Sequence, residues 1–93
     1  MNWIEVIMVR SVGRNSKVLA STLRELMNDS ADNFEHEDIR FFRREKLDSD
    51  ICIVLFHGEK KTKTGGSPLG QRLVAALQEF NLVYQTVWIE MEN

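Results

Sequence analysis

The sequence is poor in the residues that signal a disulfide-stabilised, fibrous or membrane-spanning chain. It holds one cysteine, one proline and five glycines in 93 residues, so it can form no internal disulfide and no collagen-like segment. No apolar run approaches the roughly 18 residues of a transmembrane helix, and Met1–Glu5 is no basic leader. A single cysteine and two histidines cannot alone build a closed zinc site. We therefore predict a cytoplasmic protein with no membrane partner, metal or cofactor.

What is present is typical of one small globular domain. Hydrophobic residues make up 43% and charged residues 28%, and we interpret residues 1–93 as a single domain. The net charge is −2, which gives no global field for attracting nucleic acid. A chain of this length buries only about 60 to 65% of its extended surface on folding, so its core is thin. Dimerisation would compensate for that deficit.

The first half of the chain predicts a strand, a helix and a second strand. Trp3–Val9 is rich in β-branched residues and precedes a turn-like stretch. From 16 to 28 apolar residues recur every three or four positions, which indicates an amphipathic helix, and an acidic loop is expected over 29–38. Ile39–Lys46 has two phenylalanines among three arginines, and we interpret it as a charged strand.

The second half predicts the remaining strand, helix and strand. Residues 47–50 are turn formers before the densest apolar run, Ile51–Phe56. Ser67-Pro68 is a strong helix start, with an N-cap serine and a proline at the first helical position. We expect Asn81 to end that helix in the left-handed conformation and a last strand to follow over Leu82–Met91.

The order β-α-β-β-α-β predicts an α+β fold of ferredoxin-like type. Two interleaved right-handed crossovers give one antiparallel sheet with strand order 4-1-3-2 and both helices on one face. In this order and with its apolar sheet, the chain resembles the dimeric α+β-barrel branch of the ferredoxin-like superfold. The resemblance implies two sheets facing each other around a cleft, in a group that includes cofactor-independent monooxygenases, isomerases and haem proteins.

Alternation along the outer strands assigns their two faces. We expect aliphatic residues of the first and last strands to meet the helices, namely Ile4, Val6, Met8, Val83, Val87 and Ile89. The opposite face would then be apolar as well, and a homodimer formed through it is the expected cover. The predicted dimer-interface residues are Trp3, Ile7, Val9, Tyr84 and Trp88. We predict Cys52, within the oily third strand, to be a buried small hydrophobe.

One end of the domain is a candidate anion site. If the first and third strands run parallel, their carboxyl ends and both helix N-termini lie together, where positive helix dipoles favour anions. The candidate ligands are Arg10, Arg14, His57, Lys60, Lys61, Lys63 and Ser67. This end could bind a small anion or a protein partner, but its glycines match neither a Walker loop nor a dinucleotide motif.

Two other functions compete with a homodimeric binding module. A cofactor-independent enzyme could act on a small aromatic or carbonyl compound through Glu5, His57 and Tyr84, if these lined a polar cavity between two sheets. A nucleic-acid binder could use Arg40, Arg43 and Arg44. The third strand lacks the basic and aromatic pattern of RNA-recognition motifs, which counts against that last reading.

Overall fold

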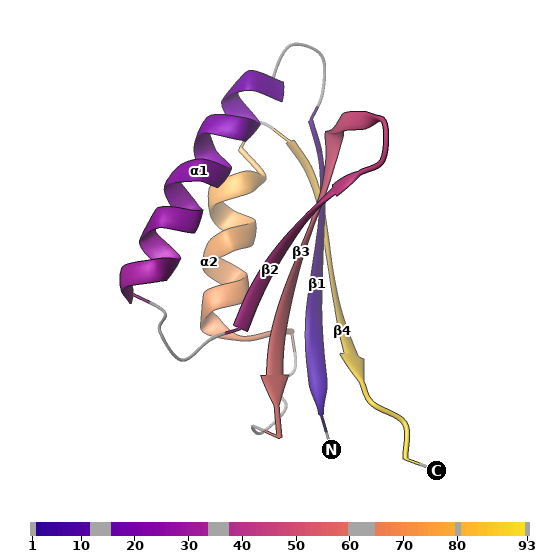
Figure 1. Ribbon diagram of the computed structural model, residues 1–93. Coiled ribbons are helices and arrows are strands. Elements are labelled where there is room, and N and C mark those ends of the chain that lie inside the picture. The colour runs from indigo at the N-terminus through magenta and orange to yellow at the C-terminus, as the bar shows by residue number, and fades with distance from the viewer. Residues whose placement is uncertain (1, 12–15, 34–37, 60–64, 80, 93) are drawn as a thin grey trace.

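Six elements follow one another in the predicted order. The computed structural model describes residues 2–11, 16–33, 38–59, 65–79 and 81–92. The elements are β1 (Trp3–Ser11), α1 (Ser16–Asn33), β2 (Asp38–Arg44), β3 (Leu47–Gly58), α2 (Pro68–Leu77) and β4 (Asn81–Ile89). The strands form one antiparallel sheet in the order β2-β3-β1-β4, which is the predicted order counted from the other edge. Both helices cover the same face (Figure 1), so the α+β architecture is confirmed and fits a ferredoxin-like arrangement.

Several boundaries differ from those predicted. Helix α1 continues to Asn33, so the first part of the acidic segment is helical. The turn between β2 and β3 is Glu45-Lys46, and the expected turn over 47–50 belongs to β3 instead. Lys46 takes a positive φ of 69°, and Arg44 pairs with Leu47 directly across this turn. Because this turn takes only two residues, β3 begins at Leu47, four residues before the apolar run Ile51–Phe56.

The two central strands, β1 and β3, run in opposite directions, whereas the sequence had predicted them to be parallel. Strand β3 is antiparallel to β1, with Val6 opposite Val54 and Met8 opposite Cys52. The expectation of parallel central strands was wrong, because each right-handed crossover skips one strand. Strands β1 and β2 are therefore parallel to each other, and β3 lies between them in the opposite direction. As a result α1 and α2 begin at opposite ends of the domain (Figure 1).

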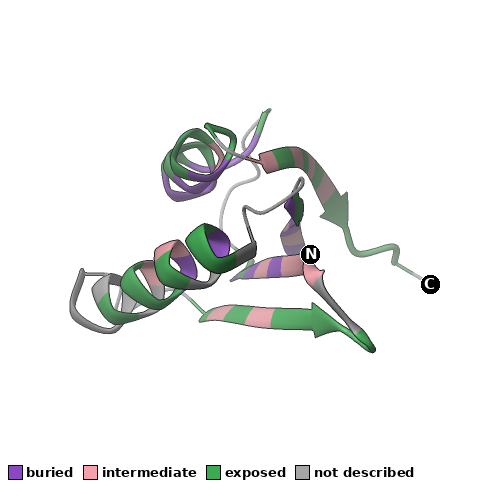
Figure 2. Ribbon diagram, turned by 90° about the horizontal axis from the view of Figure 1, so that it is seen from above, coloured by how far each residue is buried: buried purple, intermediate pink, exposed green. Residues whose placement is uncertain are grey.

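The apolar core lies between the sheet and the two helices. Strand β1 sends Ile7 and Val9 into it, and β3 sends Ile53 and Leu55. From the helices come Leu19, Leu23, Leu69, Leu73 and Leu77. Figure 2 shows buried residues on the sides of the helices that face the sheet. The leucines of α2 recur at four-residue spacing, so one stripe of the helix packs on the sheet.

The face assignment was right for β4 and wrong for β1. Trp3, Ile7 and Val9 are buried under the helices, so they cannot belong to the predicted dimer interface. Their neighbours Ile4, Val6 and Met8 lie instead on the side without helices. Tyr84 and Trp88, which pair with Met8 and Ile4, are on that side as predicted and are more than half exposed.

The uncovered side of the sheet is called the open face from here on. Its apolar residues come from all four strands: Ile4, Val6, Met8, Phe42, Cys52, Val54, Phe56, Leu82, Tyr84 and Trp88. Apolar residues therefore reach across the whole width of the sheet, and Asp38, Arg40, Thr86, Arg10 and Asp50 share the same face. Within the described ranges, neither helix combines the length and apolar character needed to cross a membrane.

Candidate functional site

A carboxylate lies completely buried between the sheet and the start of α2. Glu5 is in the middle of β1 on the helix-covered side, and its side chain is 0% exposed. Its Oε1 lies 2.6 Å from Nε2 of His57 and accepts a 2.9 Å hydrogen bond from the backbone N–H of Ser67. Its Oε2 accepts a 2.7 Å bond from the side-chain amide of Gln85. Four residues distant in sequence thus form one polar cluster, which we call the Glu5 cluster: Glu5, His57, Ser67 and Gln85.

The beginning of α2 places Ser67 at this carboxylate. Ser67 is the N-cap in an extended conformation, and its hydroxyl accepts a 3.0 Å bond from the N–H of Gly70. Pro68 follows at the first helical position, so the predicted Ser67-Pro68 start is confirmed. The N–H groups at a helix start carry partial positive charge and favour an anion. Glu5 supplies that anion from within the chain.

His57 is held from two sides. It ends the apolar run of β3, and its ring stacks on Trp3 with a centroid distance of 4.0 Å and an interplanar angle of 21°. Trp3 pairs with Gly58 across the two central strands. Both side chains are nearly inaccessible to solvent. The stack therefore closes the Glu5 cluster at the end of the sheet.

Two glycines leave room for the carboxylate. A Cβ built on Gly70 would collide with Oε2 of Glu5, although Gly70 has ordinary helical geometry. Gly66 has a φ of 96°, and a Cβ there would collide with the Gln85 amide. At Gly70 glycine is required for space, whereas at Gly66 both space and backbone conformation require it.

An ionised Glu5 carboxylate is compatible with each hydrogen bond described above. Ser67 and Gln85 present N–H donors to it, and an ionised carboxylate has only acceptors. In that state Nε2 of His57 carries the hydrogen that points to Oε1. Hydrogen bonds to an ionised acceptor are stronger than neutral ones, and the helix dipole adds to them. This cluster anchors α2 to the sheet through a charge.

The structure joins two of the three catalytic candidates and separates the third. Glu5 and His57 are in contact, but Tyr84 lies on the open face, on the other side of the sheet. A hollow of about 350 Å³ lies beside Trp3, and neither Glu5 nor His57 is among its lining residues. The three candidates therefore do not share a cavity.

The predicted anion ligands are also divided. His57 and Ser67 meet at Glu5, where the helix N-terminus already holds an internal carboxylate. Arg10 lies toward the opposite end of β1, because the central strands are antiparallel. The remaining candidates lie outside the described residues: Arg14, Lys60, Lys61 and Lys63.

Arg10 belongs to an ion-pair cluster at the edge of the open face. Its Nε lies 3.2 Å from Oδ1 of Asp50, and Nη1 of Arg44 lies 2.8 Å from Oδ2. The hydrogen bond from Arg44, followed by that from Arg10, lowers the pKa of Asp50 below its ordinary value of 3.8. Arg10 and Arg44, two of the cations that the sequence suggested as ligand-binding residues, are thus paired with one acid of the same chain.

Cys52 is only partly buried, which corrects the prediction of a fully buried residue. It lies on the open face opposite Met8 and Phe42. Removal from water raises the pKa of its thiol, because the apolar surroundings disfavour the thiolate. The side chain is consequently a weak nucleophile in an accessible place.

Sequence reasoning missed Gln85 as a member of the Glu5 cluster. Gln85 occupies a helix-facing position of β4 between Val83 and Val87, where alternation calls for an apolar residue. A polar residue at such a position was the available signal. Its partner could not be identified from sequence because Glu5 is 80 residues away.

Comparisons with known proteins add no family assignment. No protein-family model matches the chain, and no curated protein matches it in sequence. Among the described residues, no three His, Cys, Asp or Glu side chains gather as metal ligands.

Proposed function

We propose that the chain is a homodimeric interaction module whose two copies pack through their open faces. The observation that carries the proposal is the apolar character of the open face across all four strands. Met8, Tyr84 and Trp88 are each more than half exposed in a single chain. Contiguous apolar surface of this extent is rare on monomeric proteins, so a partner is expected to cover it.

The size of the open face suits a second copy. Strands of nine residues are about 30 Å long, and four strands span roughly 19 Å, which gives a flat area of about 550 Å². Side-chain relief makes the accessible area larger, toward the roughly 800 Å² per partner of a standard interface. A two-fold axis would bring equal areas together and leave neither chain with excess apolar surface.

The charges around the open face also permit self-association. Arg10 and Arg44 are paired with Asp50, and Arg40 lies 3.5 Å from Asp38. Each of these three arginines is thus paired with one of two aspartates, which reduces the repulsion between the cations of two copies. The small net charge of −2 adds little repulsion between copies.

The alternative functions have less support. An external anion at Ser67 would have to displace Glu5 from the N-terminus of α2. An enzyme using Glu5 and His57 would need a substrate to reach two side chains that are almost entirely buried. A nucleic acid would compete with Asp38 and Asp50 for Arg40 and Arg44.

Analytical ultracentrifugation at micromolar concentration tests the dimer. The variant Met8→Lys places a charge near the middle of the open face, where exposure lets a single chain tolerate it. We expect the wild type to sediment as a dimer and Met8→Lys as a folded monomer. Gln71→Lys, at an exposed position of α2, is the matched control and should remain dimeric. A monomeric wild type, or a dimer that survives Met8→Lys, would refute the proposal.

A further inference from the structure

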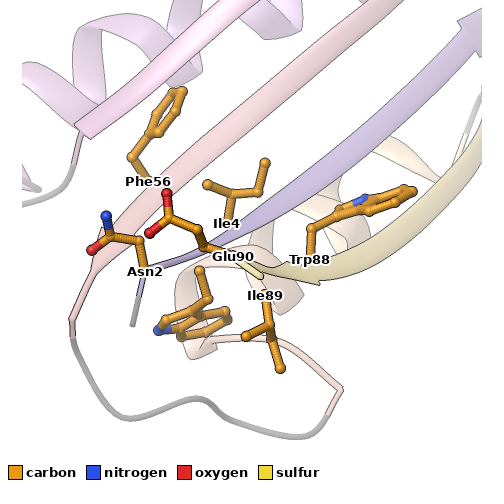
Figure 3. Close-up of a pocket in the computed structure, with 7 residues that line it drawn as sticks. Asn2, Ile4, Phe56, Trp88, Ile89 and Glu90 are labelled. Carbon is orange, nitrogen blue, oxygen red and sulfur yellow. The ribbon is translucent and has the colours of Figure 1, made fainter. Parts of the chain in front are cut away.

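The open face contains an aromatic slot near the beginning of β1. Ile4 pairs with Phe56 on one side and with Trp88 on the other, so two aromatic residues flank one aliphatic residue. Figure 3 shows Phe56 and Trp88 rising on either side of Ile4. These residues line the hollow of about 350 Å³, together with Asn2, Trp3, Ile89 and Glu90. That volume is at the lower end of the range for small-molecule sites, about 300 to 1,000 Å³.

The spacing of the slot suits a flat apolar group. Two strand intervals separate the backbones that carry Phe56 and Trp88, which is about 9.6 Å. A ring between two others needs about 3.5 to 4 Å on each side, or roughly 7 to 8 Å in total. The indole is already oriented, because its Nε1–H donates a 2.7 Å hydrogen bond to Oγ1 of Thr86. Little side-chain order would be lost on binding.

The charge of the slot selects the ligand class. Among the described residues that line the hollow, Glu90 is the one that carries a charge, and its carboxylate lies near Asn2 and Phe56 (Figure 3). The backbone of Glu90 is fixed by a 2.8 Å hydrogen bond from its N–H to the carbonyl of Asn2. The Arg40 guanidinium already lies 5.2 Å from the Phe56 ring centroid, but Asp38 lies 3.5 Å from Arg40 and offsets its charge, so Glu90 remains the charge at the hollow.

We infer that this slot binds a small flat cation, such as an aryl amidine, with its ring between Phe56 and Trp88 and its positive group at Glu90. The slot is complete within one chain, so the inference does not depend on the dimer. It lies toward one end of the sheet, whereas Met8, Cys52 and Tyr84 form a row farther along the strands. In a dimer formed through the open face the slot would lie at one end of the interface, so binding to the wild-type dimer requires that the second copy leave this end uncovered.

Three probes of equal shape and different charge test the inference. Benzamidine is a flat cation, benzamide its neutral analogue and benzoate its anionic counterpart. Binding is followed by the indole N–H signals of Trp88 and Trp3 in proton–nitrogen NMR spectra. We expect benzamidine to shift the Trp88 signal at the lowest concentration, benzamide to bind more weakly, and benzoate to bind least.

Matched variants separate the charge from the rings. Glu90→Gln should weaken benzamidine about three- to tenfold and leave benzamide unchanged, as a surface charge contact implies. Glu92→Gln removes the same charge two residues farther along and does not touch the hollow, so it should change neither. Trp88→Leu removes the indole signal, so binding to this variant is followed by the backbone amide signals of Ile4 and Glu90. It should weaken benzamidine and benzamide together, and the exposure of Trp88 means that the fold tolerates it.

Clear outcomes would overturn the inference. Equal affinity for the three probes would exclude recognition by charge, and shifts confined to Trp3 would place the probe elsewhere. Binding to monomeric Met8→Lys but not to the wild-type dimer would mean that a partner side chain fills the slot. Because binding is measured in both the wild type and Met8→Lys, failure of the slot is distinguishable from failure of the dimer.

Discussion

The two faces of the sheet reverse the usual distribution of polar and apolar side chains. The helix-covered face encloses Glu5, His57 and Gln85 in its interior, whereas the open face presents Met8, Tyr84 and Trp88 to solvent. The Glu5 carboxylate makes its hydrogen bonds with groups of the same chain. The apolar side chains of the open face, in contrast, are left in contact with water in a single chain. The comparison directs the search for function to the open face.

The largest effect is expected from removing the buried charge. Glu5→Gln keeps the size of the side chain but replaces one acceptor oxygen by an NH₂ donor, which leaves Ser67 or Gln85 with an unpaired buried N–H. We expect the free energy of unfolding to fall by about 2 to 4 kcal/mol. Urea denaturation followed by circular dichroism measures it.

The same measurement on the open face provides the contrast. Tyr84→Phe removes an exposed hydroxyl and should change the free energy of unfolding by less than about 0.5 kcal/mol. Both substitutions should be made in the Met8→Lys background, so that dissociation of a dimer does not contribute. Equal effects of Glu5→Gln and Tyr84→Phe would contradict the difference between the faces.

A smaller loss is expected when the space around Glu5 is filled. Gly70→Ala normally stabilises a helix, but here the new methyl group would meet the Glu5 carboxylate. We expect a net destabilisation of about 1 to 3 kcal/mol in thermal or urea unfolding. Gly58→Ala is the control, because its φ of 59° is strained but no atom lies within 4 Å of the new Cβ. A stabilising Gly70→Ala would show that the carboxylate has room to move.

Alkylation of Cys52 reports on the cover of the open face. The raised pKa of this thiol keeps its thiolate fraction low at neutral pH, so iodoacetamide should react more slowly with the folded chain than with urea-unfolded chain. The rate should increase with pH. If the open faces pack together, it should also increase on dilution as the dimer dissociates. A rate independent of protein concentration would argue against burial of Cys52 between two copies.

The smallest effect is expected at the edge of the open face. The pKa of Asp50 is lowered in the folded chain by Arg44 and Arg10, so the ionised form stabilises the fold above the ordinary value of 3.8. That stabilisation is lost as the pH falls through the folded pKa. Asp50→Asn should flatten the acid limb of the stability curve. In carboxyl NMR titrations, Arg44→Gln should raise the pKa of Asp50 more than Arg10→Gln does. The reverse order would show that Arg10, and not Arg44, makes the main contact with Asp50.

The sequence contained enough information for the element order and the strand order, but the directions of the central strands and the choice of faces for β1 were predicted wrongly. Periodicity identified the six elements, and Ser67-Pro68 located the start of α2. Strand β1 is apolar on both faces, so alternation alone could not decide which set is buried. We expected a carboxylate to avoid the helix-covered side. Glu5 is buried there because its donors come from segments 52 to 80 residues away, which no local pattern reveals.

The Glu5 cluster also affects how the chain assembles. Its hydrogen bonds connect β1 with β3, with the start of α2 and with β4, and they span 52, 62 and 80 residues. Contacts of such separation form after local ones, because their loop closure costs more entropy. In an intermediate in which α2 or β4 is not yet docked, Glu5 would lack some of its hydrogen-bond donors. Its carboxylate would then either be buried without those donors or stay in water, which would leave the core incomplete. The cluster therefore penalises half-assembled forms and makes folding of this small domain more nearly all-or-none.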